Sequence, residues 1–221
     1  MTTTSGSGKP PFDAVLCDID GVIRFFDHRE TGRLEAAAGL SEGATARIAF
    51  DAELGERLVL GRLTRDEWTR AVTDRLTAAG VAAPGAAGLA AAFTRAPARA
   101  DVAVVDLLRR ARRHCPVLLV TNATAWLDED LAALGLADLA DAVVNSSRVG
   151  AAKPDPRIYH LAAERAGTTP GRCLFVDDRP ENVAAAARLG MTAVLHRSPA
   201  DLCRALAPLL GPEPEEGDEA R

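Results

Sequence analysis

Two aspartates and a glycine, Asp18, Asp20 and Gly21, follow an apolar run over residues 14–17. A continuous β-prone run of this kind is typical of a central strand in a parallel sheet covered on both faces. Side chains two apart on an extended chain point the same way, here toward the crevice at the strand's carboxyl end, where open α/β sheets bind ligands. Gly21 permits a sharp turn and a close backbone approach to a ligand. Two like charges this close favour a bound cation, so the stretch predicts a Mg²⁺ site in which one carboxylate is also a nucleophile. On these residues alone, two solvated aspartates at a strand end are the alternative.

Two further segments place polar residues where phosphate could bind. Thr121 and Asn122 follow an apolar run and precede a predicted helix. A hydroxyl group and backbone N–H groups at such a place can bind an anion. The alternative is an ordinary turn, in which Thr and Asn are common. The chain uses 24 Arg but only two Lys, Lys9 near the start and Lys153 in a Gly150–Pro156 segment. A crowded site that holds phosphate and carboxylates suits a compact ammonium better than a planar guanidinium. The alternative is a surface lysine beside a proline turn.

A second acidic pair, Asp177 and Asp178, follows the apolar run Leu174–Val176. Mg²⁺ takes octahedral oxygen ligands and usually keeps several waters. Carboxylates of Asp18 and Asp178 with a backbone carbonyl would meet that demand. Adjacent strand residues point oppositely, so we expect one member of the pair to bind the metal directly and the other through water.

The elements that must position these residues alternate along the chain. After residue 100 the pattern predicts helices over 101–114, 126–134, 156–166, 180–189 and 199–210, and strands over 116–120, 142–144, 172–176 and 192–196. This alternation indicates an α/β fold, a doubly wound parallel sheet with a Rossmann-like core. Between the first strand and residue 98 only helices are expected, one of them opening at a Thr64–Glu67 capping box with Trp68, Val72 and Leu76 on one face.

This pattern predicts four parts of the chain. They are a disordered lead-in over 1–11, a catalytic core over 12–26 and 98–211, a helical cap over 27–97, and an acidic disordered tail over 212–221.

Composition argues against several classes of protein. The chain of 221 residues has a net charge of −5, most of it in the last nine residues, so the body is nearly neutral and does not favour nucleic acid. No apolar run reaches the length of a membrane span, and no secretory signal is evident. Four cysteines without a CxxC pair fit a reduced cytoplasm. We therefore expect a cytoplasmic enzyme, a monomer or homodimer, that binds neither membrane nor nucleic acid.

Four motifs together resemble the haloacid dehalogenase-like hydrolase superfamily over nearly all of residues 12–210. They are, in order, Asp18-x-Asp20-Gly21-Val22, Thr121-Asn122, Lys153-Pro154-Asp155-Pro156 and Val176-Asp177-Asp178. A helical insertion just after the first motif looks like one cap type of that family.

The resemblance implies Mg²⁺-dependent hydrolysis of a small phosphorylated metabolite through an aspartyl-phosphate. It implies that Asp18 is the nucleophile and that Asp20 is the general acid/base and offers the metal its carbonyl. Thr121 and Lys153 would hold the phosphoryl, with an N–H from Asn122. It further implies that Asp178 is a metal ligand, with Asp177 as its outer partner and Asn182 in support.

Other readings stay open at this point. Asp20 favours phosphate over halide chemistry, because a halide leaves without a proton. A sugar phosphomutase shares the motifs and is the alternative function; a non-catalytic interaction domain would be expected to lack one of them. For the substrate rim we expect Arg24 to pair with an anionic group, with Phe25, Phe26 and His28 nearby; either Phe could instead pack the cap hinge.

Overall fold

The computed structural model describes residues 10–211 and has a five-stranded parallel sheet at its centre. The strand order is β5-β4-β1-β6-β7, with β1 at Ala14–Cys17, β4 at Val117–Thr121, β5 at Ala142–Asn145, β6 at Cys173–Asp177 and β7 at Thr192–Leu195. Val15 lies opposite Val117 on one side and Leu174 on the other, so β1 is the middle strand. The parallel α/β architecture predicted from the alternating pattern is confirmed.

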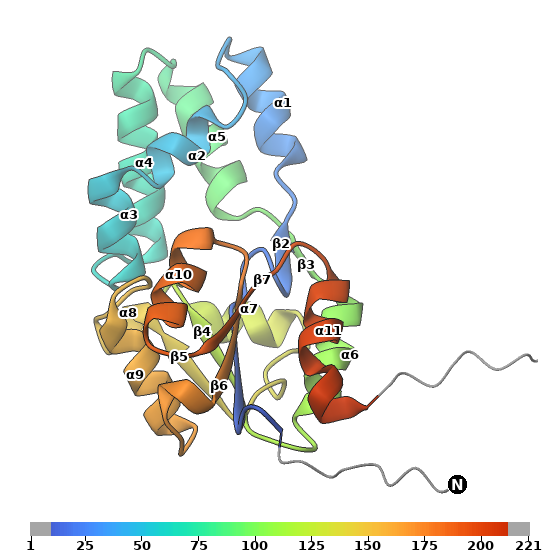
Figure 1. Cartoon of the computed structure of the whole chain (residues 1–221). Coiled ribbons are helices and arrows are strands. Elements are labelled where there is room, and N and C mark those ends of the chain that lie inside the picture. The colour runs from blue at the N-terminus through green and yellow to red at the C-terminus, as the bar shows by residue number, and fades with distance from the viewer. Residues whose placement is uncertain (1–9, 212–221) are drawn as a thin grey trace, which may run out of the picture.

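Alternate strand residues supply two separate cores, one on each face of the sheet. Val15 and Cys17 pack in one core with helices α6 (Val102–Ala111), α7 (Leu127–Ala133) and α11 (Pro199–Leu210). Ala14 and Leu16 pack in the other with α9 (Pro156–Arg165) and α10 (Pro180–Arg188). Figure 1 shows these two helix layers on either side of the sheet. Burial on both faces explains why the strands read as continuous apolar runs.

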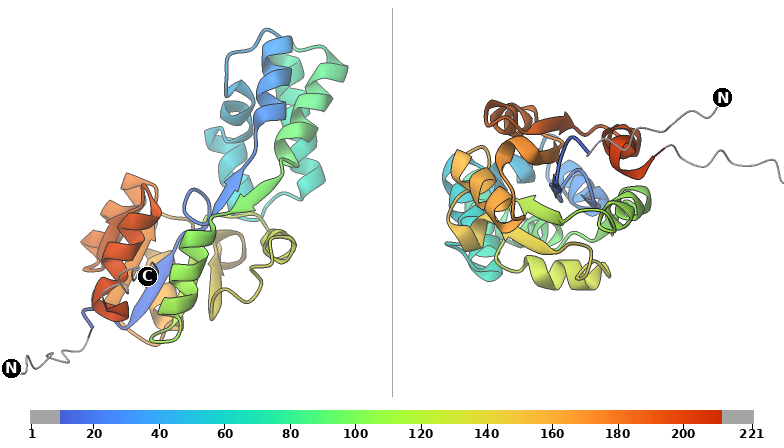
Figure 2. Two further views of the ribbon diagram at one scale, coloured as in Figure 1. Left: turned by 90° about the vertical axis from the view of Figure 1, so that its right-hand side faces the viewer. Right: turned by 60° about the horizontal axis from the view of Figure 1, so that its bottom comes forward.

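Five helices form a separate helical insertion between β2 (Arg24–Phe26) and β3 (Ala98–Ala100). They are α1 (Arg29–Ala37), α2 (Ala44–Ala49), α3 (Ala52–Val59), α4 (Arg65–Ala78) and α5 (Ala83–Thr94). The capping box at Thr64 and Glu67 is present, and Trp68, Val72 and Leu76 are buried in the insertion's own core, as predicted. The antiparallel β2–β3 ribbon is the connection between the insertion and the sheet (Figure 2).

Short elements were the ones that the sequence pattern did not predict. The ribbon strands have three residues each, and α8 (Ser146–Val149) has four, too few to show a period. The predicted lead-in, apart from Pro10 and Pro11, and the whole of the predicted acidic tail fall outside the described residues. None of the helices in residues 10–211 combines the length and apolar character needed to cross a bilayer.

Candidate active site

Side chains from the ends of three strands and one loop meet at the carboxyl edge of the sheet. Asp18 follows β1, Thr121 ends β4, Asp177 ends β6 and Lys153 follows α8. A cavity of about 320 Å³ opens there, and its lining comprises Asp18, Asp20, Gly21, Thr121, Asn122, Lys153, Asp178, Arg179 and Asn182. Parallel strands end at one edge, which brings segments more than 150 residues apart in sequence into one site.

Lys153 is the central cation of this site. Its Nζ lies 2.8 Å from Oδ1 of Asp18 and 2.7 Å from Oδ2 of Asp177, and it donates to the carbonyl of Val120 at 2.8 Å. The side chain is only 1% exposed. An ammonium so deeply buried requires ionic and hydrogen-bonding partners, and here all three of its protons have one.

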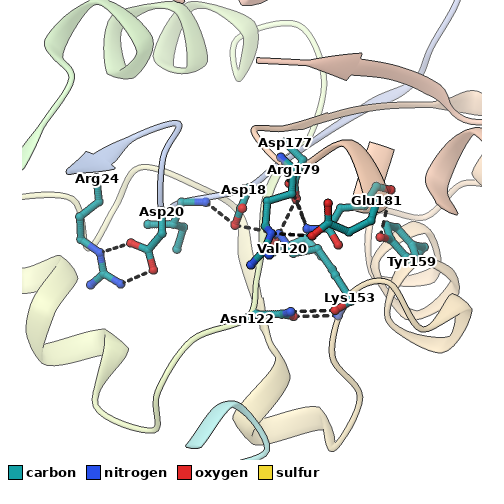
Figure 3. Close-up of polar contacts among 12 residues, drawn as sticks. Asp18, Asp20, Arg24, Val120, Asn122, Lys153, Tyr159, Asp177, Arg179 and Glu181 are labelled. Carbon is teal, nitrogen blue, oxygen red and sulfur yellow. Dashed lines mark hydrogen bonds and ion pairs between the residues drawn. The ribbon is translucent and has the colours of Figure 1, made fainter. Parts of the chain in front are cut away.

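Asn122 fixes the backbone that carries this lysine. Its Oδ1 accepts from the N–H of Lys153 at 2.7 Å, and its Nδ2 donates to the Lys153 carbonyl at 2.8 Å (Figure 3). The amide side chain therefore clasps both backbone groups of one residue. We conclude that Asn122 positions Lys153, a role that spacing in the sequence could not reveal.

The two adjacent aspartates have different surroundings. Asp177 is fully buried, and its oxygens accept from the N–H of Arg179 at 2.8 Å, from Nδ2 of Asn182 at 3.0 and 3.1 Å, and from Lys153. Asp178 instead has a buried Oδ1 without a hydrogen-bond partner in the described structure. A buried carboxylate oxygen left unpaired is costly, so Asp178 is the member of the pair with a ligand atom to offer.

The carboxylates form a set that fits Mg²⁺. Oxygens of Asp18, Asp177 and Asp178 all lie within 4.8 Å of one another, and hard oxygen donors are what Mg²⁺ prefers. Gly21 lies against this set: a Cβ at its position would lie 2.3 Å from Oδ2 of Asp178, and its φ of 85° is one that side chains rarely adopt. The glycine thus leaves the space that the Asp178 carboxylate occupies.

Burial and charge act in opposite directions on the nucleophile candidate. Desolvation raises the pKa of Asp18 to about 7, while the ammonium of Lys153 opposes that rise. Asp18 in turn raises the pKa of Lys153, against the effect of burial, so the lysine stays protonated. Both contacts made by the Asp18 carboxylate, with Lys153 and with the N–H of Ile19, fall on Oδ1. Oδ2 is therefore the oxygen available for attack.

Thr121 supplies a donor without a partner. It is buried at the end of β4, and its hydroxyl makes no hydrogen bond within residues 10–211. Thr121 belongs to the lining of the same cavity as the carboxylates. An unsatisfied buried hydroxyl in a polar cavity is what a bound anion would use.

Asp20 and Arg24 form a pair that the sequence did not predict. Arg24 donates from Nε to one oxygen of Asp20 at 2.6 Å and from Nη2 to the other at 2.9 Å (Figure 3). It also donates from Nη1 to Asp130 at 3.0 Å. Its side chain is 3% exposed. The expectation that Arg24 pairs with a substrate anion therefore does not match this geometry, because two carboxylates already occupy the guanidinium. Asp130 lies on α7, and nothing in its sequence context marked it.

The predicted rim residues divide between two faces of the β2–β3 ribbon. Phe26 and His28 line a larger cavity of about 600 Å³ between the sheet edge and the helical insertion. Phe25, named in the rim prediction, instead packs under the guanidinium of Arg99 and lies outside both cavities. Neighbouring strand residues point to opposite sides, so only one of the two Phe side chains can face the site.

Comparisons with known proteins agree with this geometry. The family model of the haloacid dehalogenase-like hydrolases matches residues 12–190. A phosphatase of Mycobacterium tuberculosis is 46% identical over 86 residues, which cover 38% of this chain and 40% of that protein. The phosphoserine phosphatase of Thermus thermophilus is 35% identical over 130 residues, 57% of this chain and 52% of that protein. The chain thus spans about half or less of these relatives' length.

A solved structure shows the same fold. An enzyme of the family from Bacteroides thetaiotaomicron, in complex with magnesium and inorganic phosphate, superposes with a TM-score of 0.64 at 20% identity, over 84% of this chain and 94% of that one. The parallel sheet, the four motifs and the family match over residues 12–190 lead to one conclusion. The chain belongs to the haloacid dehalogenase-like hydrolases.

Proposed function

We propose that this protein is a Mg²⁺-dependent phosphomonoester hydrolase that transfers the phosphoryl group to Asp18 and then to water. The observation that carries the proposal is one cavity that combines an ammonium within 2.8 Å of the Asp18 carboxylate, an unpaired buried oxygen on Asp178 and an unpaired hydroxyl on Thr121. Cations and donors placed in advance are what phosphoryl transfer requires. The phosphatases among the relatives and the neighbour that holds magnesium and phosphate support it.

Asp18 and Asp178, with the backbone carbonyl of Asp20, would hold the cation. Asp177 would act behind them, since Lys153, Asn182 and Arg179 already occupy its oxygens. Bound there, Mg²⁺ supplies positive charge to the carboxylates and to the phosphoryl oxygens.

In the first step, Oδ2 of Asp18 attacks phosphorus and the bond from phosphorus to the ester oxygen breaks. Lys153 and the hydroxyl of Thr121 stabilise the equatorial oxygens, where charge accumulates. Asn122 keeps Lys153 in place through its two backbone contacts. An alcohol leaving group takes a proton as it departs, and Asp20 gives that proton.

In the second step, water attacks the phosphorus of the aspartyl-phosphate. Asp20 accepts the proton of that water, inorganic phosphate forms, and the carboxylate of Asp18 is restored. Asp20 lines the phosphate cavity, yet its oxygens are held by Arg24 in this structure. Proton transfer therefore requires Asp20 to turn from Arg24 toward the phosphoryl group.

Two different requirements separate this proposal from the alternatives. A dehalogenase would not use a second carboxylate as an acid. A sugar phosphomutase would have to exclude water from the aspartyl-phosphate and bind a sugar bisphosphate.

Substitution of the nucleophile tests the proposal. With p-nitrophenyl phosphate and Mg²⁺, Asp18→Asn should abolish phosphate release, and EDTA should abolish release by the unmodified protein. Asp27→Asn is the matched control, because Asp27 lies nine residues on, pairs with Arg29 and lines neither cavity. Full turnover by Asp18→Asn, or turnover that EDTA does not affect, would overturn the assignment.

A further inference from the structure

The larger cavity adjoins the proposed phosphate site. Asp20 and Asn122 line both the cavity of about 320 Å³ at the carboxylates and the cavity of about 600 Å³ below the helical insertion. A volume of this size accommodates a small organic group. A phosphomonoester held at Asp18 would therefore place its alcohol part in the larger cavity.

Aromatic rings gather in the walls of this larger cavity. The chain has six Phe, two Trp and one Tyr, and five of these nine residues line it: Phe26, Phe50, Trp68, Phe93 and Trp126. His28 joins them, stacked on Phe93 with ring centroids 4.8 Å apart. The rings come from β2, the α2–α3 junction, α4, α5 and the segment after β4, so the fold gathers them from distant parts of the sequence.

Two of these rings are exposed although they are large and apolar. Phe26 is 42% and Phe50 54% exposed. Within residues 10–211 the other large apolar side chain exposed to a similar extent is Val102, which lies at the start of α6 and outside the cavity. Exposed apolar surface that gathers in one concave place is typical of a ligand-binding site.

The buried arginine of the cavity is already paired. Arg24 contacts Asp20 and Asp130, and Arg65 lies 3.2 Å from Asp130. Arg95 lies 3.9 Å from Asp66. The guanidinium of Arg24 is therefore not left over for a second phosphate or a carboxylate on the substrate. The partial burial of His28 lowers its pKa, which keeps that ring uncharged at neutral pH.

Two polar side chains of the lining are engaged as well. The hydroxyl of Thr94 donates to the carbonyl of Ala90 at 2.8 Å, and the amide of Asn122 is held by Lys153. Hydroxyl groups of a polyol would not gain the amide of Asn122 or the proton of the Thr94 hydroxyl as hydrogen-bond partners. A flat apolar group would lose nothing and would cover the exposed rings.

We propose that the leaving group of the substrate is an uncharged alcohol bearing an aromatic ring, which stacks among Phe26, Phe50 and Trp126. This inference rests on the proposed phosphatase function and narrows it. It also disfavours the sugar phosphomutase, because a sugar bisphosphate carries a second dianion and no aromatic ring.

Three phosphate donors test the inference. 2-Phenylethyl phosphate and glycerol 3-phosphate are both esters of primary alcohols, so the basicity of the leaving oxygen is similar in the two. Acetyl phosphate measures phosphoryl transfer alone, because its acetyl group is too small to reach the rings. With Mg²⁺ we expect kcat/KM for 2-phenylethyl phosphate to exceed that for glycerol 3-phosphate by about tenfold or more.

Phe50→Ala should lower the ratio of kcat/KM for 2-phenylethyl phosphate to that for acetyl phosphate by about tenfold. Val102→Ala, which removes an exposed apolar side chain outside the cavity, should leave that ratio unchanged. If acetyl phosphate is hydrolysed but glycerol 3-phosphate is preferred, or Phe50→Ala keeps the ratio, the aromatic leaving group is wrong while the phosphatase stands. If none of the three donors releases phosphate, the proposed function fails, and the inference falls with it.

Discussion

Replacing Gly21 by alanine perturbs the proposed metal site without removing any of its ligands. The added Cβ would lie 2.3 Å from Oδ2 of Asp178, so the carboxylate must retreat by about 1 Å to reach ordinary contact. Because Mg²⁺ demands near-ideal octahedral geometry, a ligand displaced by that much should weaken Mg²⁺ binding by about 10- to 100-fold. The φ of 85° adds strain of about 1–2 kcal/mol to the folded state.

Gly80→Ala separates these two effects. Gly80 has a φ of 94° at the end of α4, and a Cβ there would meet nothing within 4 Å. Urea unfolding should show a loss of about 1–2 kcal/mol in both variants, with a further loss in Gly21→Ala. Calorimetric titration should show weaker Mg²⁺ binding in Gly21→Ala alone. Equal Mg²⁺ affinity in both variants and the unmodified protein would refute the placement of Asp178 at the metal.

Three further predictions follow from the charges of the site. Lys153→Met should lower the free energy of unfolding in urea by about 3–5 kcal/mol, because it leaves the carboxylates of Asp18 and Asp177 buried without their ammonium. Added Mg²⁺ should restore part of that loss. An unchanged free energy of unfolding would contradict the ion-pair geometry. Asp20→Asn should reduce kcat/KM by about 10²- to 10⁴-fold for an alkyl phosphate but much less for p-nitrophenyl phosphate, whose leaving group needs no proton; equal losses would count against Asp20 as the acid. Burial raises the pKa of Asp18 to about 7, so protons compete with Mg²⁺ for this carboxylate below that pH. Calorimetry should therefore show the Mg²⁺ affinity falling by about tenfold per pH unit below pH 7. A Mg²⁺ affinity that stays constant from pH 8 to 5 would contradict this prediction.

The sheet and the motif positions could be predicted from sequence because both depend on local pattern. Apolar runs that alternate with helices ending at a glycine reveal the order of strands and helices along the chain. In a parallel sheet this order brings Asp18, Thr121, Lys153 and Asp178 to one edge. The scarcity of lysine drew attention to Lys153, which is buried between two carboxylates.

The contacts that depend on how distant segments pack could not be predicted from the sequence. Arg24 reaches Asp130, a residue 106 positions away on an ordinary helix, and no local pattern marks that pair. Phe25 and Phe26 are equivalent in the sequence, and only the pairing of β2 with β3 decides which of them faces the cavity. The unpartnered state of Asp178, as against the saturated Asp177, likewise emerges only from the packing around β6.

The central claim is that Asp18 receives the phosphoryl group. The most direct measurement is acid quenching of Asp20→Asn protein after incubation with p-nitrophenyl phosphate and Mg²⁺, followed by peptide mass spectrometry. In that variant the leaving group needs no acid and the water step lacks its base, so the aspartyl-phosphate should accumulate. The account predicts one phosphoryl group on the peptide that contains Asp18, and none when Asp18→Asn is added. Release of p-nitrophenol with no phosphoryl group on that peptide, or with the group on another residue, would contradict it.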